Sequence, residues 1–169
     1  MRPAHATLVL ITLIGLAGAG SMVFVIYGAW KGVAGPRGEA QTYARSAAHA
    51  ICGSWDPAEY RKRATETGNQ IFGDADLKQI MENGQAQFGK LGRIQWTRAG
   101  ALSPAKEYSR EEGAFVQITL DCRFSKSDHQ RIDLWCVEHV GKWKLAGIWF
   151  PGLSLPSRIH RPRFASVTD

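Results

Sequence analysis

Charged side chains are absent between Arg2 and Lys31, and this gap is the first feature of the sequence that restricts its function. Inside the gap, residues 6–30 form a mainly apolar run about as long as a helix that spans a bilayer. Arg2 and the small residues at 17–21 would also suit a cleavable signal peptide, but the run continues through residues 22–27, past the usual signal length. We therefore predict an uncleaved, single-pass transmembrane anchor within residues 1–31.

The charges that flank this anchor do not decide its orientation. Arg2 and the amino terminus on one side are matched by Lys31 and Arg37 on the other. Small residues at 15 and 17–20 would let a second helix approach closely, although such residues are also frequent in single spanning helices. Self-association through the anchor therefore stays open.

The sequence also lacks the motifs on which most catalytic and cofactor sites depend. It has no HExxH or paired CxxC spacing, no glycine loop for phosphates and no nucleophile motif. His49 and Cys52 share a predicted helical face, and Cys122 and Cys136 lie on a predicted sheet, but a metal site needs at least three suitable ligands within reach. We expect buried thiols or one disulfide, and we assign no catalytic, cofactor-binding or metal-binding residue.

Basic residues outnumber acidic ones, which raises the question of nucleic acid as a partner. The formal net charge is +6 and the pI is about 9.5. However, Lys and Arg are spread along the chain, and no nucleic-acid-binding motif is present. We therefore expect no nucleic-acid partner.

What the sequence does contain is a stretch, residues 114–150, that predicts three consecutive antiparallel strands. Residues 114–124 alternate strictly between apolar and polar side chains, as a half-buried strand does. Residues 130–139 and 143–150 complete the set, and Val140 and Gly141 make a tight turn between them. The predicted apolar face holds Val116, Ile118, Leu120, Cys122, Phe124, Ile132, Leu134, Cys136, Trp143, Leu145 and Trp149.

A specific register follows if Leu120 lies opposite Leu134. Ile118 then faces Cys136, and Cys122 faces Ile132. With the turn at 140–141, Cys136 meets Leu145, Ile132 meets Trp149, and Gly147 lies opposite Leu134, where it leaves room for a packed side chain. Cys136 would lie four residues along the sheet from Cys122, roughly 13 Å, so these two cannot form a disulfide. A disulfide, if present, would join Cys52 to one of them.

The opposite face of the predicted sheet carries a small charged patch made of Asp121, Arg123, Arg131 and Asp133. The same register puts like charges directly opposite each other and unlike charges on the diagonals. We interpret the patch as a solvated surface, because exposed ion pairs are common and weak. Trp135 and Ile148 fall on this side too, which predicts that another segment or a partner covers part of it.

Helices precede this sheet. Apolar residues recur at helical spacing over residues 39–52, Asp56 and Pro57 have the pattern of an N-cap and a first helical residue, and a further helix should begin at Asp74 and close near Gly89. Residues 93–97 predict a first strand, and residues 99–113 a polar connection with room for a short edge strand. Helices followed by an antiparallel sheet indicate the α+β class.

Four parts of the chain follow from these patterns. Residues 1–31 hold the anchor, 32–38 a linker with Gly and Pro, 39–150 the α+β domain, and 151–169 a basic, Pro-containing tail. The tail would be mobile, and it would either stay solvated or lie on anionic headgroups.

The soluble part resembles a recurrent group of membrane-anchored bacterial domains with the cystatin-like or nuclear-transport-factor-2-like fold. The resemblance covers about residues 39–150 and rests on Trp55-Asp56-Pro57, Lys90-Leu91-Gly92, Cys122-Arg123-Phe124 and residues 141–147 (GKWKLAG). It implies helices packed on a curved antiparallel sheet, held on the periplasmic side of the inner membrane by one helix. Its motifs concern packing and turns, so it transfers no catalytic residue.

Two functions fit this reading. The first is a non-catalytic interaction or assembly module in a membrane-associated complex, whose partners would be the bilayer and other membrane or periplasmic proteins. The alternative is a domain that binds a small ligand, or acts as an isomerase or hydrolase, in a cavity between helices and sheet. We favour the first, because the apolar face of the predicted sheet carries no acid or base.

Overall fold

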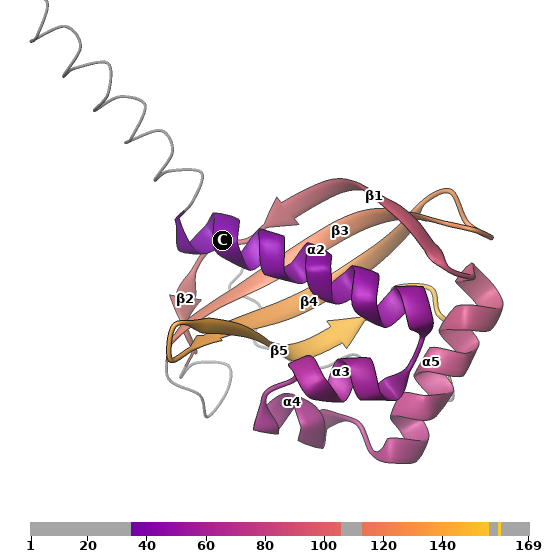
Figure 1. The fold of residues 1–169 in the computed structure, drawn as a ribbon, viewed down its shortest axis with the longest axis horizontal. Helices are drawn as coiled ribbons and strands as arrows, with labels where there is room; N and C mark the ends of the chain where they lie inside the picture. Colours follow the sequence, from indigo (N-terminus) through magenta and orange to yellow (C-terminus); the bar gives the residue numbers. More distant parts are fainter. Residues whose placement is uncertain (1–34, 106–112, 156–158, 160–169) are drawn as a thin grey trace, which may run out of the picture. The chain divides into compact units, whose positions relative to one another are not determined.

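The computed structural model describes residues 35–105, 113–155 and 159. From Glu39 onward, the described residues belong to one compact unit. Its elements, drawn in Figure 1, are the helices α2 (Pro36–Ser54), α3 (Pro57–Arg63), α4 (Glu66–Ile71) and α5 (Asp74–Phe88), and the strands β1 (Leu91–Ala99), β2 (Ser103–Pro104), β3 (Ala114–Phe124), β4 (Gln130–His139) and β5 (Lys142–Trp149). The predicted α+β class is confirmed.

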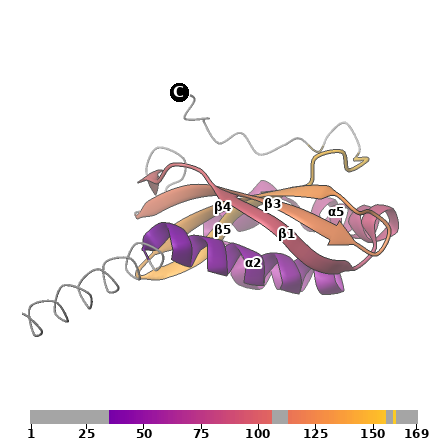
Figure 2. The same cartoon turned by 90° about the horizontal axis from the view of Figure 1, so that it is seen from above.

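The strands form one open antiparallel sheet in the order β1-β3-β4-β5, and β2 pairs with β3 beyond the end of β1. Figure 2 shows α2 lying along one face of the sheet. We call this face the inner face and the other the outer face. In the part of the chain that the structure describes, no helix is long and apolar enough to cross a bilayer, and the predicted anchor at residues 6–30 lies outside that part.

Helix α2 is amphipathic as predicted, and it is slightly longer than residues 39–52 at both ends. The helix continues through Gly53 and Ser54. The chain then turns at Trp55, whose φ of 54° lies in the left-handed region. The side of α2 that faces the sheet is fully buried and consists mainly of small residues: Ala40, Ala44, Ala47, Ala48, Ile51 and Cys52.

Trp55 fixes the end of α2 against α5. Its indole Nε1 donates a hydrogen bond to the carbonyl of Gly89 at 2.7 Å, and its ring packs against Phe150 at a centroid distance of 5.4 Å. A Cβ at Gly84, in the middle of α5, would lie 2.2 Å from the Trp55 ring. Gly84 therefore costs helix propensity but allows a close contact that no larger residue would permit.

The capping signal before α3 is confirmed, because the Asp56 side chain accepts a hydrogen bond from the Ala58 N–H at 2.8 Å and Pro57 starts the helix. The short helix α4 was not predicted. The Thr65 side chain caps it by accepting from the Gly68 N–H, and the Thr65 N–H donates to the carbonyl of Leu145 at 2.8 Å. This contact covers, at Leu145, the edge of β5 that does not pair with β4.

The predicted pairing of β3 with β4 has the correct face but is wrong by two residues. Leu134 lies opposite Ile118, and Cys136 lies opposite Val116. Cys122 faces Gln130 at the end of the ladder. A shift of two residues keeps every side chain on its predicted face, which is why the apolar pattern did not reveal it.

The turn between β4 and β5 is confirmed, with φ angles of 50° at Val140 and 69° at Gly141, both positive as in a type I′ hairpin. Cys136 pairs with Leu145 as predicted, but a bulge follows next to Trp135. Strict alternation therefore fails in β5. Gly147 pairs with Trp135 instead of Leu134, and Trp149 pairs with Asp133 instead of Ile132.

The same bulge moves Ile148, which was wrongly predicted on the outer face, into the main core, where it is 1% exposed. The core also continues past Phe150, because Leu153 and Ile159 are each only 8% exposed and belong to it. The predicted mobile tail is therefore wrong for these two residues. Residues 156–158 and 160–169 lie outside the described part.

Candidate interaction surface

The inner face of the sheet is filled by packing. Ile118, Leu120, Ile132 and Leu134 have no exposed surface and belong to one core cluster with the apolar sides of α2 and α5. Two tyrosines in this region already have acceptors: the Tyr43 hydroxyl donates to the Arg63 carbonyl and the Tyr60 hydroxyl to the Gly68 carbonyl. Burial raises the pKa of both phenols, so they stay protonated at neutral pH.

The three cysteines are free and buried. Burial raises the pKa of Cys52 and Cys136, and it raises the pKa of Cys122 to about 12, with a smaller contribution from the nearby Asp121 carboxylate. A protonated thiol is a poor nucleophile and a poor metal ligand. Cys136 pairs with Val116, six residues before Cys122, so about 20 Å separates the two sheet cysteines and excludes a disulfide between them.

His49 does not join these thiols. Its side chain is exposed, whereas Cys52, one turn further along α2, is fully buried. Their predicted common face is therefore wrong, because residues three apart on a helix differ by about 60° around its axis and the sheet covers only one of the two. Over the described ranges, no cluster of His, Cys, Asp and Glu could hold a metal ion.

The outer face has an apolar part near β2. Phe115, Trp135 and Val137 are at most 5% exposed and form a second cluster, to which Ala105 and Ala146 also belong. The prediction that Trp135 lies on a covered part of the outer face is confirmed. This cluster is separate from the main core on the other side of the sheet.

The rest of the outer face is charged, but its pattern differs from the prediction. Because of the two-residue shift, Asp121 lies directly opposite Arg131, so unlike charges face each other. Asp133 is not solvated: it has no exposed surface, and its Oδ1 accepts hydrogen bonds from Thr119 at 2.9 Å and from Arg131 at 2.8 Å. The remaining charges of this patch are exposed or half-buried.

The edge strand β1 borders this charged region and carries its most exposed aromatic residue. Trp96 is 51% exposed and pairs with Asp121 of β3, which places it on the outer face. Arg98, paired with Thr119, and Arg93, paired with Arg123, flank it on the same face and are exposed. Neither Arg93 nor Arg98 has an ionic partner among the residues that the structure describes. We call these three residues the β1 surface.

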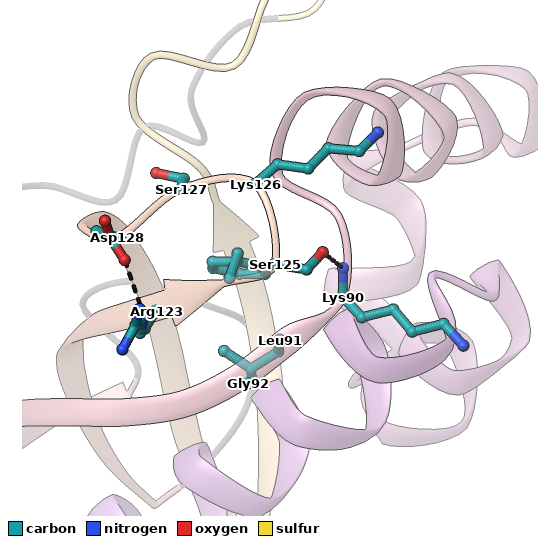
Figure 3. A pocket seen from close by; sticks show the side chains of 9 residues that line it. Lys90, Leu91, Gly92, Arg123, Ser125, Lys126, Ser127 and Asp128 are labelled. Atoms are coloured by element: carbon teal, nitrogen blue, oxygen red, sulfur yellow. Dashed lines mark hydrogen bonds and ion pairs between the residues drawn. The ribbon is translucent and has the colours of Figure 1, made fainter.

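A depression of about 660 Å³ adjoins the β1 surface, where β1 begins and β3 ends. Lys90, Arg123 and Lys126 line it, and Arg123 pairs with Asp128 at 2.9 Å. Figure 3 shows the lysine side chains extending away from Arg123, and the Lys126 ammonium donates to the Ala86 carbonyl at 2.8 Å. The cationic groups therefore do not converge on a common point, and the depression extends the basic surface.

Sequence reasoning did not identify the β1 surface. It placed a strand at residues 93–97, but Trp96 and the arginines received no role. Strict alternation would put Arg93 on one face and Trp96 and Arg98 on the other. The register shift between Ile94 and Trp96 brings all three onto the outer face, and the residue pattern gives no sign of it. The available signal was a tryptophan with one arginine three residues before it and another two residues after it.

Comparison with models of protein families, with curated proteins and with solved structures found no match to this chain.

Proposed function

We propose that this chain is a non-catalytic, single-pass membrane protein of the bacterial inner membrane, whose periplasmic α+β domain is an interaction module in a membrane-associated complex. The observation that carries the proposal is the β1 surface. Trp and Arg are enriched among the residues that contribute most to binding at protein interfaces. Here an exposed tryptophan lies between two arginines that have no ionic partner among the described residues.

The inner face supports an interaction role over the alternative of a ligand-binding or isomerase-like cavity. General acid–base catalysis needs a titratable group that changes protonation near the working pH. The buried titratable groups between helices and sheet are thiols and phenols whose pKa values burial raises away from neutrality. The architecture of helices on an antiparallel sheet also agrees with the cystatin-like or nuclear-transport-factor-2-like resemblance, which remains part of the proposal.

The test of assembly uses the full chain, extracted from its own cells in a mild uncharged detergent and sized by sedimentation. We expect a particle larger than one chain with its micelle, containing a second protein in fixed stoichiometry. The double variant Trp96→Ser, Arg98→Ser should sediment as the single chain. A control variant, Val140→Asn, removes an apolar side chain that is 86% exposed in the turn between β4 and β5 and should leave the particle intact.

The location is tested separately. Protease added to spheroplasts should digest the domain, and the mass of the mature chain should include residues 6–30. Complete protection in permeable spheroplasts would place the domain on the other side of the membrane. A mature chain that starts near Ser21 would show a cleaved signal peptide instead of an anchor.

A further inference from the structure

We propose that the free edge of β1 receives an extended, acidic segment of a partner protein as an added strand, with an apolar side chain against Trp96 and an acidic one two positions away against Arg98. This inference rests on the proposed interaction function and names the chemistry of the partner. It follows from three features of β1: its unpaired edge, the register of its last residues and its uncompensated charge.

The two edges of the sheet differ. The edge of β5 is covered at Leu145, because the Thr65 N–H donates to the Leu145 carbonyl and Ala64 forms a bridge to the same residue. Within the described part of the chain, β1 pairs with β3 alone, so its other side presents backbone N–H and C=O groups. An extended peptide binds such an edge through main-chain hydrogen bonds and gains specificity from alternate side chains.

The segment of β1 that could take a strand is residues 96–99. Its pairing with Asp121, Leu120, Thr119 and Ile118 runs without interruption, whereas both register shifts lie before Trp96. In this segment Trp96 and Arg98 point to the outer face, and Thr97 lies on the inner side between them. The Arg45 guanidinium of α2 donates to the Thr97 hydroxyl at 2.9 Å, so this side of the edge also carries a positive charge.

The charges around this edge select an acidic partner. The acidic groups of the same face already have partners: Asp121 contacts His129 at 3.5 Å, Asp128 pairs with Arg123, and Asp133 with Arg131. Arg93 and Arg98 have no ionic partner in the described ranges, so no ion pair there neutralises them. Opposite charges across neighbouring strands are stabilising, and like charges are destabilising.

The same charges argue against a second copy of this chain. Arginine and bulges on an edge strand are devices that prevent edge-to-edge pairing between identical molecules. Two β1 edges brought together would place the arginines of one copy beside those of the other, and each copy has a formal net charge of +6. An anionic membrane surface would accept the arginines and Trp96 but would make no use of the unpaired backbone.

The first experiment measures binding of a defined probe to the full chain in uncharged detergent. The probe is a fluorescent peptide of sequence Glu-Val-Glu-Thr-Glu-Val-Glu, and the readout is its anisotropy. We expect saturable binding that falls at least tenfold with Arg98→Glu and with Trp96→Ala, and stays within twofold with the control Val140→Asn. A peptide with lysine in place of glutamate should not bind.

Two further probes separate strand addition from other modes of binding. The same acidic peptide with alternate backbone nitrogens methylated cannot donate main-chain hydrogen bonds to β1. We therefore expect its affinity to fall at least tenfold. Equal affinity for the methylated peptide, or no saturable binding of the parent, would overturn the proposal. So would binding to phosphatidylglycerol vesicles that Arg98→Glu abolishes while peptide binding is unaffected.

The third experiment identifies the molecule that contacts the β1 edge in cells. A photo-crosslinker at Gln95, which is exposed beside Trp96, should capture one partner segment that carries an acidic residue two positions from an apolar one. Capture of lipid, of a second copy, or of nothing beyond a Val140 control would contradict strand addition. If the sedimenting complex survives in the Trp96 and Arg98 variants, this inference fails while the assembly function stands.

Discussion

The two faces of the sheet are built from the same alternating strands but serve different purposes. Inner-face residues such as Leu134 and Cys136 are fully buried against α2 and α5, and their contribution is stability. The outer face is divided into a covered apolar cluster around Trp135 and a charged region that ends at the exposed Trp96. Burial thus marks the parts of this domain that hold it together, and exposure of a large aromatic residue marks the part that we propose a partner contacts.

The largest effect should come from the inner face. Leu134→Ala removes a side chain with no exposed surface from the centre of β4, and such truncations typically cost about 2–5 kcal/mol. Urea denaturation of the full chain, followed by circular dichroism, measures the change. The control on the outer face, Arg123→Ala, should change the free energy of unfolding by less than about 0.5 kcal/mol. Equal losses in both variants would contradict the assignment of faces.

A second effect tests the contact between α5 and the end of α2. Gly84→Ala would force its Cβ into the Trp55 ring, and overpacking of this kind costs about 1–3 kcal/mol. The matched control is Gly53→Ala in α2, where a Cβ meets nothing within 4 Å. There alanine should stabilise by roughly 0.5–1 kcal/mol through helix propensity. Stabilisation by both alanines would show that Trp55 does not need the glycine.

Asp133 is a buried acidic residue on the outer face, and its removal should cost less than that of a large core residue. Asp133→Ala leaves the Thr119 hydroxyl and the Arg131 guanidinium without this acceptor, which should destabilise by about 1–3 kcal/mol. Asp128→Ala breaks a pair in which both side chains are more than half exposed, so its effect should lie between 0 and about 1 kcal/mol. Thermal melts of the two variants compare them directly.

The smallest effect at neutral pH concerns the thiols. Folding raises their pKa values above the ordinary value near 9, so the folded state holds protons that the unfolded chain releases in alkali. Their contribution to stability is therefore complete below about pH 8 and is lost as the pH rises from about 9 toward 12.

Measurement of the free energy of unfolding as a function of pH checks the direction of this change. Cys122→Ala should lower stability by the same amount throughout pH 6–8, because it truncates a buried side chain, and should reduce the further loss of stability above pH 9. At pH 8, a thiol reagent should label three cysteines in urea and almost none in the folded protein. Rapid labelling without urea would contradict the burial of the thiols.

The sequence predicted the elements of this domain better than their relative positions. The apolar side of α2, the Asp56 cap and the start of α5 at Asp74 were predictable because each depends on neighbouring residues. The offset of β3 against β4 was not, because a shift of two residues preserves the face of every side chain. The bulge beside Trp135 likewise leaves no local signal, yet it decides whether Ile148 or Trp149 enters the main core.

The candidate site was predictable only in part. The sequence predicted a charged outer face with a covered Trp135. It did not predict that Asp133, one of the four charged residues of that patch, is buried. It could not identify the β1 surface, because exposure of Trp96 depends on β1 being the last strand of the sheet. Strand order is a property of the whole chain, and no local pattern in residues 93–97 encodes it.

The order of the elements also has a consequence for how the chain folds during synthesis. Helix α2 ends at residue 54, and β3, which supplies the centre of its binding face, begins at residue 114. At about 5–20 residues per second, the ribosome makes these 60 residues in roughly 3–12 s. A helix of this length is only marginally stable by itself in water. Its alanine-rich side therefore stays unfolded or bound to a chaperone until the strands have been made. The contact between α4 and the sheet can form only when β5 has emerged and the Leu145 carbonyl can accept the Thr65 N–H. Addition of the last strand is therefore the step that commits the nascent chain to its fold.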